Sequence, residues 1–331
     1  MPELRWLAAL LAVALAACSQ AAAAPPPLPL TAVKDIPVGP PSRRFDYASL
    51  DPVAGLLFFA DLAGSRVMVV DVKGARLVKA VPDVASAHGV LAAPELGRVY
   101  ASATGSHELV AIDEKTLAVT ARSPAGRYPD GIAFDPKERK LYVSDEKGGQ
   151  VAVIDAASHR LLKLIRMGGE VGNTQYDPGS GLIYSNAQGR GELVAIDPRT
   201  DEIVSREALP GCAGNHGLLI DAARRLAFIA CEDNARLIEL SLVTKARIGE
   251  DTVGGGPDVL AYDPGLRRLY VSSESGVVSV FQVGDGKVAK LGQGLLADNA
   301  HTVAVDPTTH IVYFPLRNVD GRAIVRVMAP R

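Results

Sequence analysis

The sequence predicts an all-β fold made of seven copies of one unit, and three regularities along the chain indicate it. An Asp-Pro turn, or a variant of it, recurs at Asp51, Ala93, Asp135, Asp177, Asp221, Asp263 and Asp306. The residue five positions before each turn, which we call the rim residue, repeats at intervals of 42, 42, 42, 44, 42 and 43. Twelve positions after each rim residue there is an aromatic residue, namely Phe58, Tyr100, Tyr142, Tyr184, Phe228, Tyr270 and Tyr313. A period of this length, with several short strands in each copy, is typical of a β-propeller, here with seven blades.

The third copy shows how one unit becomes a blade. Residues 131–134 are a short apolar run, as in a buried inner strand, and Asp135-Pro136 begins the polar turn after it. Residues 141–144 and 150–154 predict the second and third strands. The alternating residues 160–165 predict the outer strand. Each copy is therefore predicted to be a four-stranded antiparallel blade.

The two ends of the repeat region predict how the ring closes. The seventh copy has strands near residues 311–314 and 323–327 but no outer strand. Residues 30–38 have strand character and belong to no copy. We therefore expect this N-terminal strand to pair with Ala323–Val327 and complete the last blade, because closure removes the open edges of a sheet. The propeller is then expected to span residues 29–331.

Residues 1–17 predict a lipoprotein signal peptide that is not part of the fold. The apolar stretch 7–17 is too short for a stable membrane-spanning helix. Leu15-Ala-Ala-Cys18 resembles the bacterial lipobox, which implies cleavage before Cys18 and lipidation of its thiol; the alternative is an ordinary signal peptide with an incidental cysteine. Residues 18–28 are rich in Ala and Pro and are expected to form a tether. We therefore expect a periplasmic or cell-surface protein anchored to a membrane, with Ser19 favouring the outer membrane.

The composition argues against a nucleic-acid partner and limits the cysteine chemistry. The chain has 331 residues, of which 48% are hydrophobic and 22% charged, and a formal net charge of -2. The chain lacks long basic runs, so we expect no binding to nucleic acid. We also expect the protein to be a monomer. Cys212 and Cys231 are the only cysteines besides Cys18 and predict a disulfide in an oxidising compartment. The alternative is that a free Cys231 thiol joins His216 as a soft metal ligand.

The rim residues are the first candidates for a functional site. They are Asp46, His88, Asp130, Gly172, His216, Asp258 and His301. Because the innermost strands of a propeller line its central channel, these side chains are expected to form a ring around one channel mouth. Three converging imidazoles at His88, His216 and His301, with carboxylates to receive their second ring N–H, would suit a divalent metal such as Zn, Ca or Mg. The alternative is structural: the rim side chains bind the backbone of the neighbouring blade or hold water.

Further polar residues are expected at the same mouth. The residue fifteen positions after the rim residue should lie opposite it, which adds Asp61 and Asp145, and Asn173 directly follows Gly172. The predicted ligand-binding set is Asp46, His88, Asp130, Asn173, His216, Asp258, His301, Asp61 and Asp145. The loops that follow add Glu146, Glu232, Asp233 and Glu274, so the mouth is predicted to be acidic and to attract metals, amines or other cations. The opposite face collects basic turn residues, among them Lys140, Arg224, Arg225, Lys245 and Arg247.

The repeat resembles that of the YVTN-family β-propellers. The resemblance is carried by Tyr128-Pro-Asp-Gly-Ile-Ala-Phe-Asp-Pro136, Lys140-Leu-Tyr-Val-Ser144 and Gln150-Val-Ala-Val-Ile-Asp155. It covers residues 29–329 and implies a bacterial periplasmic or cell-surface protein. That family includes binding modules, scaffold-like proteins and relatives of lactonase and lyase propellers, so the resemblance implies the fold more than the activity.

Three functions remain open from the sequence. The first is a lipid-anchored propeller that binds a protein, a peptide or a small cationic ligand at the acidic mouth. The second is a metal-dependent lyase or lactonase-like hydrolase that uses the His and Asp ring, because propeller lyases are similar in having channel-facing histidines. The third is a scaffold that binds another envelope protein on the basic face. No His-Glu-x-x-His, Gly-x-Ser-x-Gly or phosphate-binding loop motif is present, so no catalytic residue is predicted.

Overall fold

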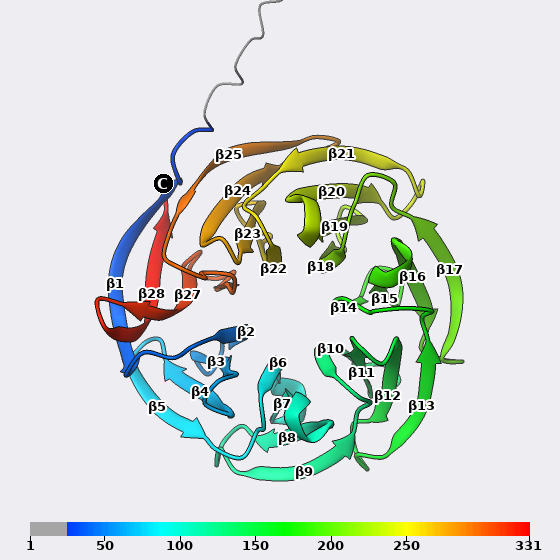
Figure 1. Ribbon diagram of the computed structural model, residues 1–331, viewed down its shortest axis with the longest axis horizontal. Coiled ribbons are helices and arrows are strands. Elements are labelled where there is room, and N and C mark those ends of the chain that lie inside the picture. The colour runs from blue at the N-terminus through cyan, green and yellow to red at the C-terminus, as the bar shows by residue number, and fades with distance from the viewer. Residues whose placement is uncertain (1–24) are drawn as a thin grey trace, which may run out of the picture.

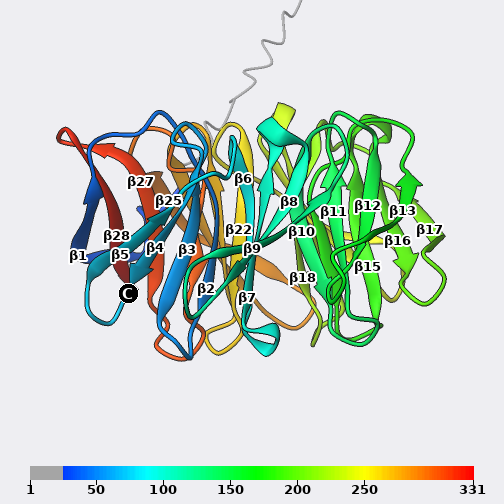
Figure 2. The ribbon, with the colours of Figure 1, turned by 90° about the horizontal axis from the view of Figure 1, so that it is seen from below.

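Seven four-stranded antiparallel sheets are arranged in a ring around a central axis (Figure 1) and stand side by side when the ring is seen edge on (Figure 2). The structure is a computed structural model and describes residues 25–331. The predicted signal peptide, Cys18 and the first part of the predicted tether lie outside the described residues. Within residues 25–331, no helix has the length and apolar character needed to cross a membrane. The predicted seven-bladed β-propeller is confirmed.

In blades 1 to 6 the strands follow the chain outward from the channel. Blade 1 consists of β2(Phe45–Asp51), β3(Leu56–Asp61), β4(Arg66–Asp71) and β5(Arg76–Val81). Blade 2 consists of β6(Ala87–Ala93), β7(Arg98–Ala103), β8(Glu108–Asp113) and β9(Val119–Pro124). Blade 3 consists of β10(Pro129–Asp135), β11(Lys140–Asp145), β12(Gln150–Asp155) and β13(Leu161–Arg166). Blade 4 consists of β14(Thr174–Asp177), β15(Leu182–Ala187), β16(Glu192–Asp197) and β17(Glu202–Ala208).

The remaining blades have the same order, except that the outer strand of blade 7 comes from the N-terminal end of the described chain. Blade 5 consists of β18(Asn215–Asp221), β19(Leu226–Cys231), β20(Arg236–Ser241) and β21(Arg247–Thr252). Blade 6 consists of β22(Pro257–Asp263), β23(Arg268–Ser273), β24(Val277–Val283) and β25(Val288–Leu295). Blade 7 consists of β26(Ala304–Val305), β27(Val312–Val319), β28(Arg322–Pro330) and β1(Leu30–Gly39). Short 3-10 turns occur at η1(Pro94–Leu96), η2(Thr104–Ser106), η3(Gln188–Arg190) and η4(Glu232–Asn234).

An aspartate at the end of the inner strand explains why the chain turns there. Its carboxylate accepts a hydrogen bond from the backbone N–H two residues further on, from Val53 to Asp51 at 2.7 Å and from Lys137 to Asp135 at 2.9 Å. The same contact recurs at Asp177, Asp221 and Asp306. Such side-chain bonds to the local backbone favour a turn over a continuing strand. The repeated Asp-Pro signal therefore marks the inner hairpin turn of a blade.

The hydrophobic core lies between the blades. Seven buried clusters each combine apolar side chains of two adjacent blades. In one of them, Phe58 and Val69 of blade 1 pack with Val99 and Val110 of blade 2. The seven aromatic residues twelve positions after the rim are at most 5% exposed, which confirms that they are core residues. Because successive strand residues face opposite sides of a sheet, each blade buries one face against each neighbour.

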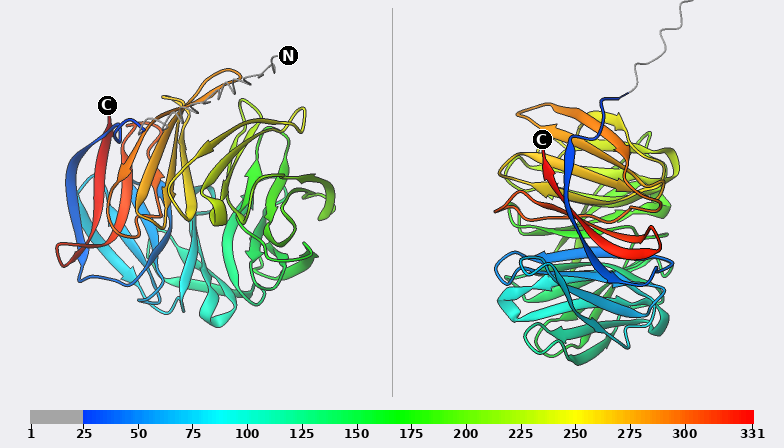
Figure 3. Two further views of the ribbon diagram at one scale, coloured as in Figure 1. Left: turned by 45° about the horizontal axis from the view of Figure 1, so that its top comes forward. Right: turned by 90° about the vertical axis from the view of Figure 1, so that its left-hand side faces the viewer.

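β1 closes the ring by pairing with β28, as the two strands lying side by side in Figure 3 show. The antiparallel pairing runs from Leu30 with Pro330 to Gly39 with Ala323. The predicted pairing of residues 30–38 with residues 323–327 is confirmed. The chain before β1 also contacts the fold, because the Gln293 N–H of β25 donates to the Pro26 carbonyl at 2.9 Å. The end of the predicted tether therefore lies along blade 6.

The register of the inner strands corrects one prediction. The residue fifteen positions after the rim residue pairs with the residue before the rim: Phe45 pairs with Asp61, and Pro129 pairs with Asp145. A register shift follows directly, so the rim residue and its successor have no partner in the second strand. A bulge of this kind changes the direction of side chains. Asp61 and Asp145 are therefore not opposite the rim residues, and the rim side chains are free to face the channel.

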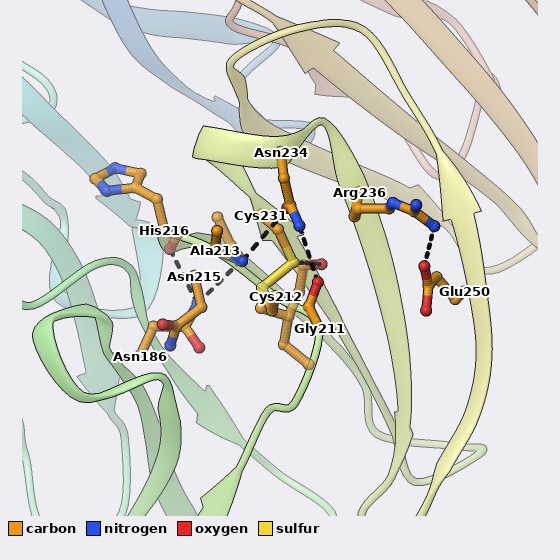
Figure 4. Close-up of a disulfide and its surroundings, with 12 residues drawn as sticks. Asn186, Gly211, Cys212, Ala213, Asn215, His216, Cys231, Asn234, Arg236 and Glu250 are labelled. Atoms are coloured by element: carbon orange, nitrogen blue, oxygen red, sulfur yellow. Dashed lines mark hydrogen bonds and ion pairs between the residues drawn. A yellow bond between two sulfur atoms is a disulfide. The ribbon is translucent and has the colours of Figure 1, made fainter.

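Cys212 and Cys231 form the predicted disulfide (Figure 4). It joins the loop before β18 to the end of β19, across a sequence separation of 19. Cys231 pairs with Asn215 in the sheet, and Figure 4 shows the ring of His216 pointing away from the two sulfur atoms. The alternative, in which a free Cys231 thiol and His216 hold a metal together, does not fit this arrangement.

Candidate functional site

A cavity of about 270 Å³ occupies the mouth of the central channel. Blades 1, 2, 3, 5 and 6, with their adjoining loops, form its wall: Arg44, Asp46, Tyr47, Leu62, His88, Tyr128, Asp130, Glu146, His216, Glu232 and Asp258. Five of these residues are predicted rim residues, and Glu146 and Glu232 come from the predicted acidic loops. The wall thus contains five carboxylates, and Arg44 is its only lysine or arginine.

Asp61 and Asp145 do not line this mouth, and the prediction that they do is wrong. Both side chains are fully buried within their blades. Asp61 accepts hydrogen bonds from Ser42 Oγ at 2.6 Å and from Arg66 Nε at 2.8 Å. Asp145 accepts one from the Tyr128 backbone N–H at 2.6 Å. Because the register of the second strand differs by one residue from the predicted one, both carboxylates point towards the neighbouring loops and accept hydrogen bonds from them.

Arg44 joins the acidic residues of blades 1 and 6. Its guanidinium donates to Asp46 at 3.0 Å and to Glu274 at 2.6 Å, and it lies 3.7 Å from Asp258. Burial opposes the charge of Arg44, but the neighbouring carboxylates outweigh that effect and raise its pKa. His301 is 1% exposed and lies behind this group, with Nε2 3.9 Å from both the Asp46 and the Asp258 carboxylate. This side of the mouth therefore holds a positive charge that belongs to the chain itself.

His216 lies between two buried aspartates on the other side of the mouth. Its Nε2 is 3.6 Å from Asp258 Oδ1 and 3.8 Å from Asp130 Oδ2, and neither oxygen has a hydrogen-bond partner among the described residues. Burial raises the pKa of Asp130 to about 8, with His216 acting against the shift and Asp46 adding to it. Burial and the nearby Asp46 also raise the pKa of Asp258. Near neutral pH the Asp130 carboxyl is therefore mostly protonated, and a cation in the mouth would compete with that proton.

In the described part of the chain, the ring nitrogens of His88, His216 and His301 do not all lie within 4.8 Å of one another, so the three imidazoles do not converge as the prediction requires. His88 and His301 place Nδ1 beside the backbone carbonyl two residues earlier, at 2.9 and 3.1 Å, and His216 Nδ1 faces the Gln188 side chain at 3.0 Å. Carbonyl groups rather than the rim aspartates therefore orient these rings. Within residues 25–331, one set of three His, Cys, Asp or Glu side chains has ligand atoms all within 4.8 Å of one another, and it is Asp46, Asp258 and His301.

Four residues of the mouth are not found by the sequence patterns, namely Arg44, Tyr47, Leu62 and Tyr128. Arg44 and Tyr128 lie two positions before the rim residues of their copies, and Tyr47 lies one position after. Tyr47 could have been found by comparing the copies, because the second, third and fifth copies have glycine at the position that Tyr47 occupies in the first. Tyr47 therefore adds a side chain at a place where blades 2, 3 and 5 have none.

Comparison with known proteins supports the fold. No protein-family model matches the chain, and no curated protein matches it in sequence. A hydrazine synthase chain from Kuenenia stuttgartiensis is 14% identical, with a TM-score of 0.74 over 89% of this chain and 97% of that chain. The WD40 repeats of RRP9 are 11% identical, with a TM-score of 0.77 over 91% of this chain and 100% of that chain. A streptogramin B lyase is 11% identical, with a TM-score of 0.73 over 89% and 96%.

These similarities concern the β-propeller fold alone, because all three identities are 14% or lower. The matched proteins have different functions, as is common for this fold. Membership of the YVTN family stays a prediction.

Proposed function

We propose that this protein is a membrane-anchored envelope β-propeller that binds a compact cationic ligand in its acidic channel mouth. The observation that carries the proposal is the wall of the mouth, where five carboxylates face one cavity and Arg44 is the only lysine or arginine. Asp130 Oδ2 and Asp258 Oδ1 are buried there without a hydrogen-bond partner among the described residues. Burying such groups unpaired is unfavourable. A ligand with a positively charged nitrogen would supply the missing charge and, where it carries N–H groups, the missing donors.

Replacing Arg44 with glutamine is expected to increase the affinity for tetramethylammonium about tenfold or more. The guanidinium holds Asp46 and lies near Asp258, so it both occupies these carboxylates and repels a second cation. Titration calorimetry measures the affinity, and tetramethylammonium is a suitable probe because its charge does not change with pH.

The matched control is Arg43→Gln, which removes the same charge from the exposed neighbouring residue and should leave the affinity unchanged. Acetate should not bind to either variant. The proposal is contradicted if tetramethylammonium and methylammonium bind neither the wild-type protein nor the Arg44 variant, or if acetate binds as well as they do.

Membrane attachment is proposed through lipidated Cys18, with the outer membrane as the favoured location. The protein is expected to partition into detergent, and a Cys18→Ser variant is expected to move to the aqueous phase. Each acyl CH₂ that enters a bilayer contributes about 0.8 kcal/mol, so loss of the acyl chains removes the anchor. A serine variant that still partitions into detergent would show that something other than this thiol holds the protein.

A divalent metal is the second candidate occupant. The observation that favours it is the set of Asp46, Asp258 and His301, in which the buried His301 Nε2 has no hydrogen-bond partner among the described residues. These residues would hold the ion, and an ion there would supply a Lewis acid for a lyase or lactonase-like reaction. Arg44 already occupies the carboxylates, which is why we place this function second. Metal analysis of the purified protein and of a His301→Ala variant tests this second function. The function requires one metal ion per wild-type protein and its loss in the variant.

The basic face is a weaker candidate for binding an envelope protein. Its side chains pair with carboxylates of the same molecule: Lys140 with Asp201, Arg224 with Asp221, Arg225 with Asp177, Lys245 with Glu207 and Arg247 with Glu250. These pairs neutralise much of the positive charge locally. The acidic mouth keeps unpaired carboxylate oxygens and is therefore the better supported site.

A further inference from the structure

The position directly after the rim residue is glycine in blades 2, 3 and 5 and another residue in blades 1, 4, 6 and 7. In chain order it holds Tyr47, Gly89, Gly131, Asn173, Gly217, Val259 and Thr302. Glycine is required where the next blade approaches closely: a Cβ at Gly89 would lie 2.1 Å from the Asp130 carbonyl oxygen. Tyr47 and Asn173 instead place large polar side chains at this inner position.

These two side chains meet across the channel. The Tyr47 hydroxyl donates a hydrogen bond to Asn173 Oδ1 and lies 3.3 Å from His216 Nε2. Tyr47 belongs to β2 of blade 1, whereas Asn173 and His216 belong to blades 4 and 5, which lie opposite blade 1 in the ring (Figure 1). The tyrosine side chain therefore spans the axis of the channel.

A second cavity of about 160 Å³ lies in the channel on the other side of this contact. Its lining is mixed: apolar side chains, among them Val90, Leu91, Ile132, Leu218, Val259 and Val303, lie beside polar residues such as Ser49, Thr174 and Gln175, and no charged residue of the described chain lines it. Of the residues that line the acidic mouth, Tyr47 is the only one that also lines this second cavity. Asn173 lines the second cavity, directly beneath the tyrosine hydroxyl. The first cavity is therefore lined by charged residues and the second by uncharged ones, and the two meet at the Tyr47 side chain.

We infer that Tyr47 and Asn173 form a bar that closes the channel below the acidic mouth and so determines which cations bind. The bar makes the mouth a blind pocket that admits a compact cation and excludes one with a long alkyl chain. This inference rests on the proposed cation binding, whose ligand class it narrows. Without the bar, the charged head of an amphipathic amine would remain among the carboxylates, and its alkyl chain would extend into the uncharged second cavity, against side chains such as Val90, Leu218 and Val303.

The test compares tetramethylammonium with butyl- and hexyltrimethylammonium, each titrated by calorimetry into the wild-type protein, Tyr47→Phe and Tyr47→Gly. The wild-type protein and Tyr47→Phe both keep the aromatic side chain at position 47. For these two proteins the affinity is expected not to increase with the length of the alkyl chain of the ligand. For Tyr47→Gly the affinity is expected to increase with chain length, by at most about fourfold per methylene, because complete burial of a CH₂ contributes about 0.8 kcal/mol. Tyr47→Ala takes the place of the glycine variant if that variant does not fold. An equal increase with chain length in wild type and in the shortened variant would overturn the inference.

A measurement without ligand separates this inference from the proposed function. Thermal unfolding of Tyr47→Phe, Asn173→Ala and the double variant tests the contact itself. When two residues share one hydrogen bond, the stability losses caused by replacing each of them do not add up in the double variant. The loss in Tm of the double variant is expected to be smaller than the sum of the single losses. Fully additive losses would overturn the bar. If no ammonium ion binds any variant but the losses are non-additive, cation binding fails while the bar remains.

Discussion

At about pH 9, one unit above the pKa of Asp130, replacing Asp130 with asparagine is expected to weaken tetramethylammonium binding about 10- to 100-fold. At about pH 6 the same replacement is expected to have little effect. The reason is that burial raises the pKa of this carboxyl to about 8. Below that pKa the wild-type side chain is neutral, as asparagine is; above it, the carboxylate attracts the ligand. A charge pair about 6 to 8 Å apart, at an effective dielectric constant of about 20, contributes about 2 to 3 kcal/mol.

Several charged groups near Asp130 affect its pKa and therefore the pH at which binding changes. His216 favours the carboxylate, whereas Asp46, Glu146 and Asp258 oppose it. Wild-type affinity should therefore increase as the pH rises through about 8 and then level off, because binding displaces a proton. Asp285→Asn is the matched control, since that side chain is 85% exposed and does not line the mouth. Equal weakening by Asp130→Asn at both pH values would mean that no proton is linked to binding.

The same raised pKa determines how Asp130 affects stability. The folded-state pKa is raised from 3.8 to about 8, so the contribution of this group to the free energy of unfolding is fully present below about pH 4 and is lost as the pH rises to 8. Asparagine does not titrate and avoids this loss. The Tm of Asp130→Asn relative to wild type is expected to increase between about pH 5 and pH 8 and then to stay constant. A difference that does not change over this range would contradict the raised pKa.

Replacing Ile36 with alanine is expected to lower the free energy of unfolding by about 2–5 kcal/mol. Ile36 lies in β1, is 1% exposed, and packs in the cluster that joins blade 7 to blade 1. Removing its side chain leaves a void at the seam where the two ends of the chain close the ring. In every other blade the four strands follow one another along the chain, whereas β1 and β28 come from opposite ends of the fold and are held together only by their pairing and packing. Urea unfolding followed by circular dichroism measures the loss.

Val33→Ala is the matched control for this prediction. Val33 lies in the same strand but is 56% exposed, so its loss should change the free energy of unfolding by less than about 0.5 kcal/mol. If the two replacements lower the free energy of unfolding equally, the buried face of β1 stabilises the closed ring no more than its exposed face does. A large effect of Ile36→Ala alone would identify the N-terminal strand as essential to the ring.

The parts of the fold that follow from local sequence could be predicted. Each copy of about 42 residues contains its own apolar strands and its own turn aspartate, such as Asp135 with its bond from the Lys137 N–H. The missing outer strand of the seventh copy and the unassigned strand at residues 30–38 were enough to predict the closure. The rim positions could be predicted in the same way, because they occur at a constant distance from the turn.

The side chains that shape the mouth depend on contacts that no local pattern contains. The bulge after Phe45 and Pro129 shifted the partner of the second strand by one residue, and so Asp61 and Asp145 lie inside their blades. Tyr47 meets Asn173 at a sequence separation of 126, which requires the ring to place blades 1 and 4 across from each other.

The sequence by itself determined the number of blades, the closing strand, the disulfide and the acidic character of the mouth, because each depends on composition or on short, repeated spacings. Only the tertiary structure decided which carboxylates face the cavity, that Arg44 pairs with some of them, and that burial raises the pKa of Asp130. The physical reason is that desolvation and charge at the mouth are set by side chains from several blades, brought together only when the ring is closed.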